Sequence, residues 1–72
     1  MNVELYTRDG CMFCDQAKLY LNKKQIEYHE YKIGIDVTRD SVIETFPGVK
    51  KLPIITIDGA HIGGYQQLVE QV

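Results

Sequence analysis

The sequence lacks any long apolar run, and this absence excludes a membrane-spanning helix within these residues. No stretch of its 72 residues approaches the roughly 20 consecutive apolar residues that cross a bilayer. Residues 1–4 have neither the basic start nor the apolar stretch of a secretory signal peptide. The simplest expectation is a soluble protein of the cytoplasm that has no membrane partner.

Basic residues are also few and scattered. Eight lysines and arginines stand against ten acidic residues, so the formal net charge is −2. There is no basic stripe interleaved with aromatic residues, which a nucleic-acid-binding protein needs to neutralise phosphates. We therefore expect no nucleic acid among the partners.

The short length predicts a single domain over residues 1–72. A domain of this size buries only about 60% of the surface of its unfolded chain, so it has no room for a large internal cavity. A ligand would have to lie in a surface groove. We find no internal repeat, linker or low-complexity segment in the sequence.

Cysteine is scarce too, but Cys11 and Cys14 form a C-x-x-C motif. A purely structural disulfide here would close nearly the shortest possible loop and would restrict the unfolded chain little. Together with His29 and His61, the two cysteines would make a Cys2His2 set of possible zinc ligands. These histidines lie far apart in the sequence, whereas zinc fingers separate theirs by about three to five residues. We expect no metal and favour a redox pair.

Hydrophobic periodicity predicts an α/β chain with the order β-α-β-α-β-β-α. The first three elements form a βαβ unit with parallel strands, and the last two strands form a hairpin around Asp58-Gly59. Alternation is imperfect in 26–33, and either a bulge or burial on both faces of that strand explains it. The predicted strands cover 3–7, 26–33, 53–57 and 60–62, and the predicted helices cover 11–24, 39–46 and 65–72.

The C-x-x-C motif lies at the predicted start of a helix directly after a strand, which is a redox signature. A helix N-terminus offers partial positive charge and free N–H donors, both of which stabilise a thiolate. Cys11 would lie at or near the N-cap, whereas Cys14 lies about one turn deeper and should be less exposed. This arrangement predicts Cys11 as the nucleophile and Cys14 as the resolving thiol.

Three segments of the chain resemble the glutaredoxin family, in the family's order. Residues 6–14 resemble its start, where an aromatic residue precedes the second cysteine of the redox pair. Lys51-Leu52-Pro53 resembles its Thr-Val-Pro segment, which carries a cis proline, and residues 61–65 resemble the diglycine that opens its last helix. The resemblance covers essentially the whole chain and is nearest to the short bacteriophage glutaredoxins. It implies a thioredoxin-like fold with three α/β/α layers and a four-stranded mixed sheet.

The resemblance also implies a groove for glutathione. Arg8 takes the position of a basic residue near the glycine carboxylate, and the backbone of Leu52 pairs with the peptide. Phe13 replaces the usual tyrosine beside the thiol, although it also heads the apolar stripe of its helix and equally fits the core. The remaining implied contacts are Pro53 and the start of the last helix, Gly64, Tyr65 and Gln66, which holds the γ-glutamyl carboxylate.

The activity implied is that of a dithiol glutaredoxin, a monomeric enzyme that reduces protein disulfides and glutathione mixed disulfides with glutathione. Its substrates would be disulfide-containing proteins such as ribonucleotide reductase, in the host cytoplasm if a phage encodes it. Gln66 and Gln67 stand where many glutaredoxins have aspartates that attract the γ-glutamyl ammonium. This departure leaves open a glutaredoxin-like electron donor to ribonucleotide reductase that is recharged by thioredoxin reductase. Two further alternatives are a glutathione-ligated iron–sulfur carrier, which usually lacks the second cysteine, and a non-catalytic thiol adaptor.

Overall fold

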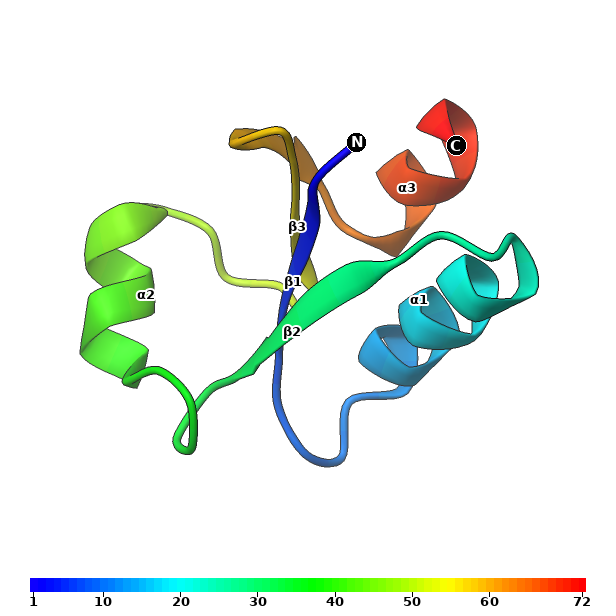
Figure 1. The fold of residues 1–72 in the computed structure, drawn as a ribbon. Coiled ribbons are helices and arrows are strands. Elements are labelled where there is room, and N and C mark those ends of the chain that lie inside the picture. Colours follow the sequence, from blue (N-terminus) through cyan, green and yellow to red (C-terminus); the bar gives the residue numbers. More distant parts are fainter.

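The computed structural model describes residues 1–72 and places a four-stranded sheet between two helical layers (Figure 1). Helices α1 and α3 cover one face of the sheet and α2 covers the other. The predicted element order and the three-layer α/β/α arrangement are therefore confirmed. The strands are β1 (Val3–Thr7), β2 (Tyr28–Lys32), β3 (Ile54–Ile57) and β4 (Ala60–Gly63), and the helices are α1 (Met12–Lys23), α2 (Arg39–Thr45) and α3 (Tyr65–Gln71).

The sheet is mixed and has the order β2-β1-β3-β4. Strand β1 runs parallel to β2 and antiparallel to β3, and β3 and β4 form the predicted antiparallel hairpin. The turn of this hairpin has positive φ at Asp58 (51°) and Gly59 (85°), as a type I′ turn requires. Because β3 is antiparallel to β1, the C-terminal end of β1 and the N-terminal end of β3 lie side by side at the same end of the sheet.

Strand β2 is partly covered on both faces, which explains its imperfect alternation, although none of its residues is fully buried. Its register with β1 is unbroken from Val3 opposite Tyr28 to Thr7 opposite Lys32, so the bulge alternative is wrong. Tyr28 packs against the core, whereas the ring of Tyr31 stacks on that of Tyr6 at 5.1 Å on the opposite face. The irregular register in this sheet lies instead between β3 and β4.

The main core lies between the sheet and the α1/α3 layer. Helix α1 buries Cys14, Ala17 and Leu21, which recur at helical spacing. Phe13 is 58% exposed, so the core alternative for this residue is wrong and the small Cys14 takes its place in the stripe. The central cluster consists of six buried residues: Val3, Leu5, Ala17, Leu21, Ile55 and Leu68.

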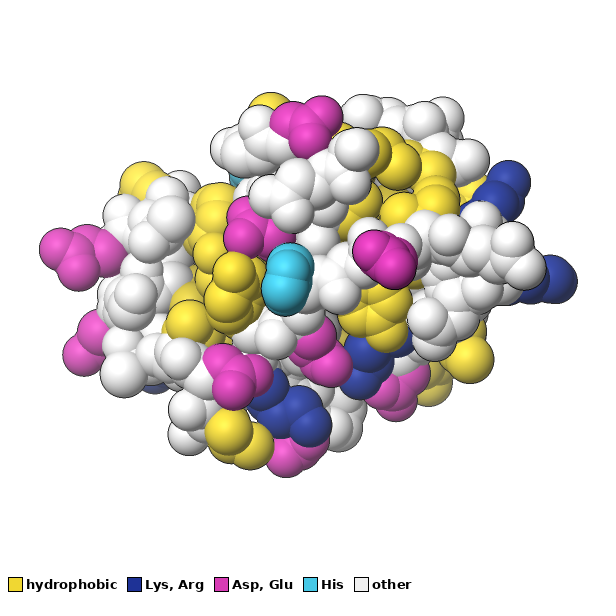
Figure 2. Space-filling view, in the orientation of Figure 1, with side chains coloured by type: hydrophobic (Ala, Val, Ile, Leu, Met, Phe, Trp, Pro, Cys, Tyr) yellow, Lys and Arg dark blue, Asp and Glu magenta, His cyan; other side chains and the backbone are white.

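Helix α2 is held on the other face by fewer contacts. Its N-cap is Thr38, because the Thr38 hydroxyl accepts a hydrogen bond from the Ser41 amide at 3.1 Å. Val42 is its only buried residue, and Phe46 just beyond it packs edge-on against Tyr6 at 5.1 Å. Apolar atoms form a column between α2 and the sheet, while charges of both signs are scattered over the same face (Figure 2).

No helix of the structure combines the length and the apolar character needed to cross a membrane.

The inward and outward faces of α1 provide a direct test of the core. Leu21 is fully buried, whereas Leu19 on the same helix is 67% exposed. We expect Leu21→Ala to lower the free energy of unfolding by about 2–4 kcal/mol, because it leaves a cavity. Leu19→Ala is the matched control and should change it by less than about 0.5 kcal/mol. Urea unfolding of the oxidised protein measures both values, and equal losses would contradict this assignment of the faces.

Candidate active site

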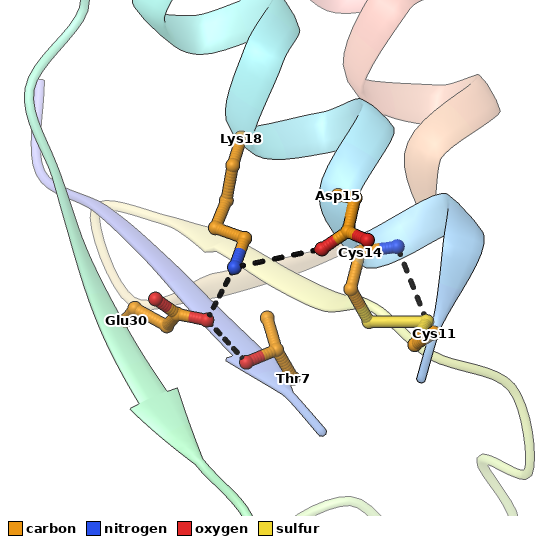
Figure 3. Close-up of a disulfide and its surroundings, with 6 residues drawn as sticks. All are labelled: Thr7, Cys11, Cys14, Asp15, Lys18 and Glu30. Carbon is orange, nitrogen blue, oxygen red and sulfur yellow. Dashed lines mark hydrogen bonds and ion pairs between the residues drawn. A yellow bond between two sulfur atoms is a disulfide. The ribbon is translucent and has the colours of Figure 1, made fainter. Parts of the chain in front are cut away.

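The C-x-x-C motif lies where β1 passes into α1. Gly10 precedes it with a φ of 76°, a left-handed conformation that glycine adopts without strain. Cys11 is the N-cap of α1, as predicted: its backbone is extended, and its Sγ accepts the backbone N–H of Cys14 at 3.1 Å. A disulfide joins Cys11 to Cys14 (Figure 3).

The two sulfur atoms differ in accessibility. Cys14 is fully buried in the core, whereas Cys11 is partly exposed and lines a surface groove. In the reduced protein, the free amides and the positive end of the α1 dipole favour a thiolate on Cys11. Burial penalises a charge on Cys14. An incoming disulfide would therefore meet a single reachable and activated sulfur.

A polar network behind the cysteine pair ties α1 to the sheet. Glu30 on β2 accepts hydrogen bonds from the Thr7 hydroxyl at 2.6 Å and from the Lys18 ammonium at 3.1 Å (Figure 3). The Lys18 ammonium also lies 3.7 Å from the Asp15 carboxylate. Thr7 is fully buried, so Glu30 supplies the partner that its hydroxyl needs. The network holds the first turns of α1 against β1 and β2.

This network shifts the ionisation of both its charged members. The hydrogen bond from Thr7, helped by Lys18, lowers the pKa of Glu30 below its ordinary value. The hydrogen bond to Glu30 is the largest cause that raises the pKa of Lys18. Sequence reasoning missed the network. The sequence does contain a clue to the network: Lys18 lies one helical turn beyond Cys14, on the face of α1 that packs against the parallel strands β1 and β2.

A groove of about 940 Å³ opens beside Cys11. Three of the residues assigned to glutathione from the sequence, Arg8, Phe13 and Leu52, line it together with Cys11. The groove is also lined by residues to which the sequence assigned no binding role. These come from α2 and from the segment before Leu52: Arg39, Val42, Ile43, Lys50 and Lys51.

The other predicted contacts lie beyond this groove, on the α3 side of Phe13. The Phe13 and Tyr65 rings are 6.1 Å apart. The Leu52–Pro53 peptide bond is cis, as the resemblance implied, and Pro53 is buried. A Cβ added to Gly64 would lie 3.4 Å from the Pro53 carbonyl oxygen, so the start of α3 directly adjoins the proline segment.

Helix α3 begins at the N-cap Gly64, and Gln67 satisfies one of its first amides. The Gln67 Oε1 accepts the Gly64 N–H at 2.9 Å. The amides of Tyr65 and Gln66 donate no hydrogen bond within the chain. These two amides are thus available to an anion, and the exposed Gln66 side chain lies beside them.

The two histidines are separated by the width of the sheet. His29 lies on β2 and His61 on β4, which are the opposite edge strands. The Cys2His2 set that can be counted in the sequence is therefore not brought together.

The geometry agrees with what is known of related proteins. The Glutaredoxin family model matches residues 3–62. This chain belongs to the glutaredoxin family. Glutaredoxins are thiol–disulfide oxidoreductases that use glutathione as a reductant, and Cys11 and Cys14 provide the redox pair here. The nearer resemblance to the bacteriophage members stays a prediction.

Individual relatives support this membership. The glutaredoxin is 40% identical over 63 residues to a probable glutaredoxin of Synechocystis sp., covering 86% of this chain and 72% of the relative. It is 38% identical over 68 residues to glutaredoxin 3 of Escherichia coli, covering 93% and 81%. The crystal structure of glutaredoxin 1 from Francisella tularensis, complexed with cacodylate, superposes with a TM-score of 0.80 at 30% identity, covering 96% and 88%.

The charge network of the glutaredoxin makes its stability depend on pH. Because the pKa of Glu30 is lowered in the folded state, the unfolded chain binds this proton more readily. The stabilisation is fully present above the ordinary glutamate value of 4.5 and is lost as the pH falls through the folded-state pKa.

We expect Glu30→Gln to lower the free energy of unfolding at neutral pH by about 1 kcal/mol, the scale of a partly exposed charged hydrogen bond. It should also flatten the decline in stability that sets in as the pH falls below 4.5. The exposed Glu27, which forms no ion pair or side-chain hydrogen bond, provides the control variant Glu27→Gln. Urea unfolding at several pH values measures the effect, and identical profiles for the two variants would contradict it.

Proposed function

We propose that this protein is a dithiol glutaredoxin that reduces protein disulfides and glutathione mixed disulfides, with glutathione as its reductant. The observation that carries the proposal is the unequal exposure of two bonded cysteines at the start of α1. Cys11 is accessible in a groove, whereas Cys14 is fully buried behind it. We place the reaction in the cytoplasm, where thiols are kept reduced.

The proposed reaction proceeds by two thiol–disulfide exchanges. The Cys11 thiolate attacks one sulfur of the substrate disulfide, forms a mixed disulfide, and releases the other substrate sulfur as a thiolate. Cys14 then loses its proton and attacks the Cys11 sulfur, which releases the substrate thiol and leaves the Cys11–Cys14 disulfide. One glutathione opens this disulfide by attacking Cys11, and a second glutathione removes the first as glutathione disulfide.

The two ends of glutathione would be held on either side of Cys11. Arg8 can form a forked contact with the glycine carboxylate, and the Leu52 backbone can pair with the peptide. Phe13, Pro53 and Tyr65 would flank the thiol. The γ-glutamyl carboxylate would meet the free amides of Tyr65 and Gln66. These assignments are supported by the neighbourhood of the residues around Cys11.

A second candidate is an electron donor to ribonucleotide reductase that is recharged by thioredoxin reductase. This candidate is favoured by the residues at the N-terminus of α3, because neither Gln66 nor Gln67 offers a carboxylate to the γ-glutamyl ammonium. The Gln67 oxygen already accepts the Gly64 amide proton. Coupled assays with glutathione and its reductase, and with thioredoxin reductase, separate the two candidates.

The roles of the two cysteines can be separated by mutation. Cys11→Ser should abolish disulfide exchange, because the attacking atom is removed. Cys14→Ser should accumulate a mixed disulfide with glutathione yet still turn over glutathionylated substrates, since a second glutathione can resolve it. The measurements are steady-state reduction of a glutathionylated peptide and the intact mass of each variant. A greater loss of activity in Cys14→Ser would mean that the roles are reversed.

The glutathione contacts can be tested through the apparent KM for glutathione. We expect Arg8→Ala to raise it several-fold, because partly exposed charged contacts contribute about 0.5–2 kcal/mol. Gly64→Val should raise it further by filling the approach to Pro53, and the φ of −110° at Gly64 suits any residue. Gln66→Asp should lower it by restoring a charge for the ammonium.

Lys23→Ala, at the exposed far end of α1, is the control for lost positive charge. If Arg8→Ala and Gly64→Val are folded and leave the KM unchanged, glutathione is not held in this way. The donor recharged by thioredoxin reductase then becomes the preferred function.

A further inference from the structure

The groove beside Cys11 continues beyond the proposed glutathione contacts. Arg8, Phe13 and Leu52 line it, but Pro53 and the start of α3 do not. Its remaining wall is formed by α2 and the segment before Leu52, and includes Arg39, Ile43, Lys50 and Lys51. A part of the groove therefore leads from the redox pair toward α2 without an assigned occupant.

Every charged side chain that lines this groove is cationic. Arg8, Arg39, Lys50 and Lys51 line it, whereas none of the chain's ten acidic residues does. These four are half of the eight basic residues in a chain whose net charge is −2. All four side chains are exposed, and none forms an ion pair or a side-chain hydrogen bond. Such a one-sign groove attracts and orients an anionic partner.

The same groove exposes apolar side chains next to the reactive sulfur. Met12 is 71% exposed, Phe13 58% and Ile43 49%, and all three line the groove. Apolar side chains gathered with unpaired cations fit a segment of protein better than a free anion, which would make no use of them. Lys51 also stands where the Thr-Val-Pro segment of glutaredoxins has threonine, so its charge is a feature of this chain.

We propose that the protein substrate presents its disulfide on an acidic segment that also carries an apolar residue beside the cysteine. This proposal rests on the function proposed above and specifies its substrate. The acidic side chains lie against Arg39, Lys50 and Lys51, and the apolar residue contacts Met12 and Ile43. Cys11 attacks the cysteine sulfur of the segment, and the sulfur bonded to it leaves as a thiolate, as in the exchange described above.

A single-turnover experiment with matched peptides tests the charge preference. Each peptide carries one cysteine as a mixed disulfide with 2-mercaptoethanol, next to a leucine, and is flanked by glutamates or by lysines. Reduced protein is mixed with each peptide without glutathione, so binding of glutathione plays no part. We expect the acidic peptide to react about tenfold faster at low salt, and the ratio to shrink as salt is added. Replacing the leucine by serine in the acidic peptide should slow it several-fold.

Variants locate the preference on the molecule. Lys50→Gln combined with Lys51→Gln, and separately Arg39→Gln, should each lower the acidic-to-basic rate ratio several-fold. The control combines Lys23→Gln with Lys24→Gln at the far end of α1, outside the groove, and should keep the ratio of the unaltered protein.

The possible outcomes distinguish the two proposals. Equal rates for both peptides, or an equal loss of the ratio in the Lys23/Lys24 control, would overturn the substrate proposal and leave the redox function intact. Competition by a single-stranded oligonucleotide as strong as that by a cysteine-free acidic peptide would also overturn it, because the groove would then select any polyanion. No reaction with either peptide would overturn the proposed redox function together with the substrate proposal.

Discussion

The cap that Cys11 places on α1 is the interaction on which the site depends. The Cys11 sulfur accepts the backbone N–H of Cys14 at 3.1 Å, and this hydrogen bond fixes the point where the loop after β1 ends and α1 begins. The same geometry sets the two sulfurs one turn apart, so that one stays near the surface while the other points into the core. The reactivity of the pair therefore follows from the way in which the helix starts.

This start is useful only because the rest of α1 is held firmly. Leu21 and Ala17 bury the inner face of the helix in the main core, and Lys18 connects it to Glu30 on β2. Glu30 in turn satisfies the buried hydroxyl of Thr7, the last residue of β1. Strand, helix and neighbouring strand thus meet directly behind Cys14, where a shift of α1 would change the depth of both sulfurs.

The opposite layer has a different character. Helix α2 buries a single residue and is held mainly by aromatic contacts at its end, and this leaves its remaining side chains free to form the wall of a groove. The charge of that groove differs in sign from the charge of the whole chain. Recognition is consequently better judged from the local charge around Cys11 than from the net charge, because screening limits the reach of distant charges to about 10 Å.

Local features of the sequence were sufficient for the redox motif, the order of elements, the Cys11 cap and the Asp58-Gly59 turn, because capping, turn chemistry and periodicity act over a few residues. Tertiary structure decided which side chains are buried and which residues from distant segments lie close together. It exposed Phe13 and buried Cys14, gave β2 two packed faces, and joined Thr7, Lys18 and Glu30. It also brought Arg39 and Lys51 to the groove of Cys11. These neighbours come from distant segments, and only the pairing of the strands and the packing of the layers sets their distance.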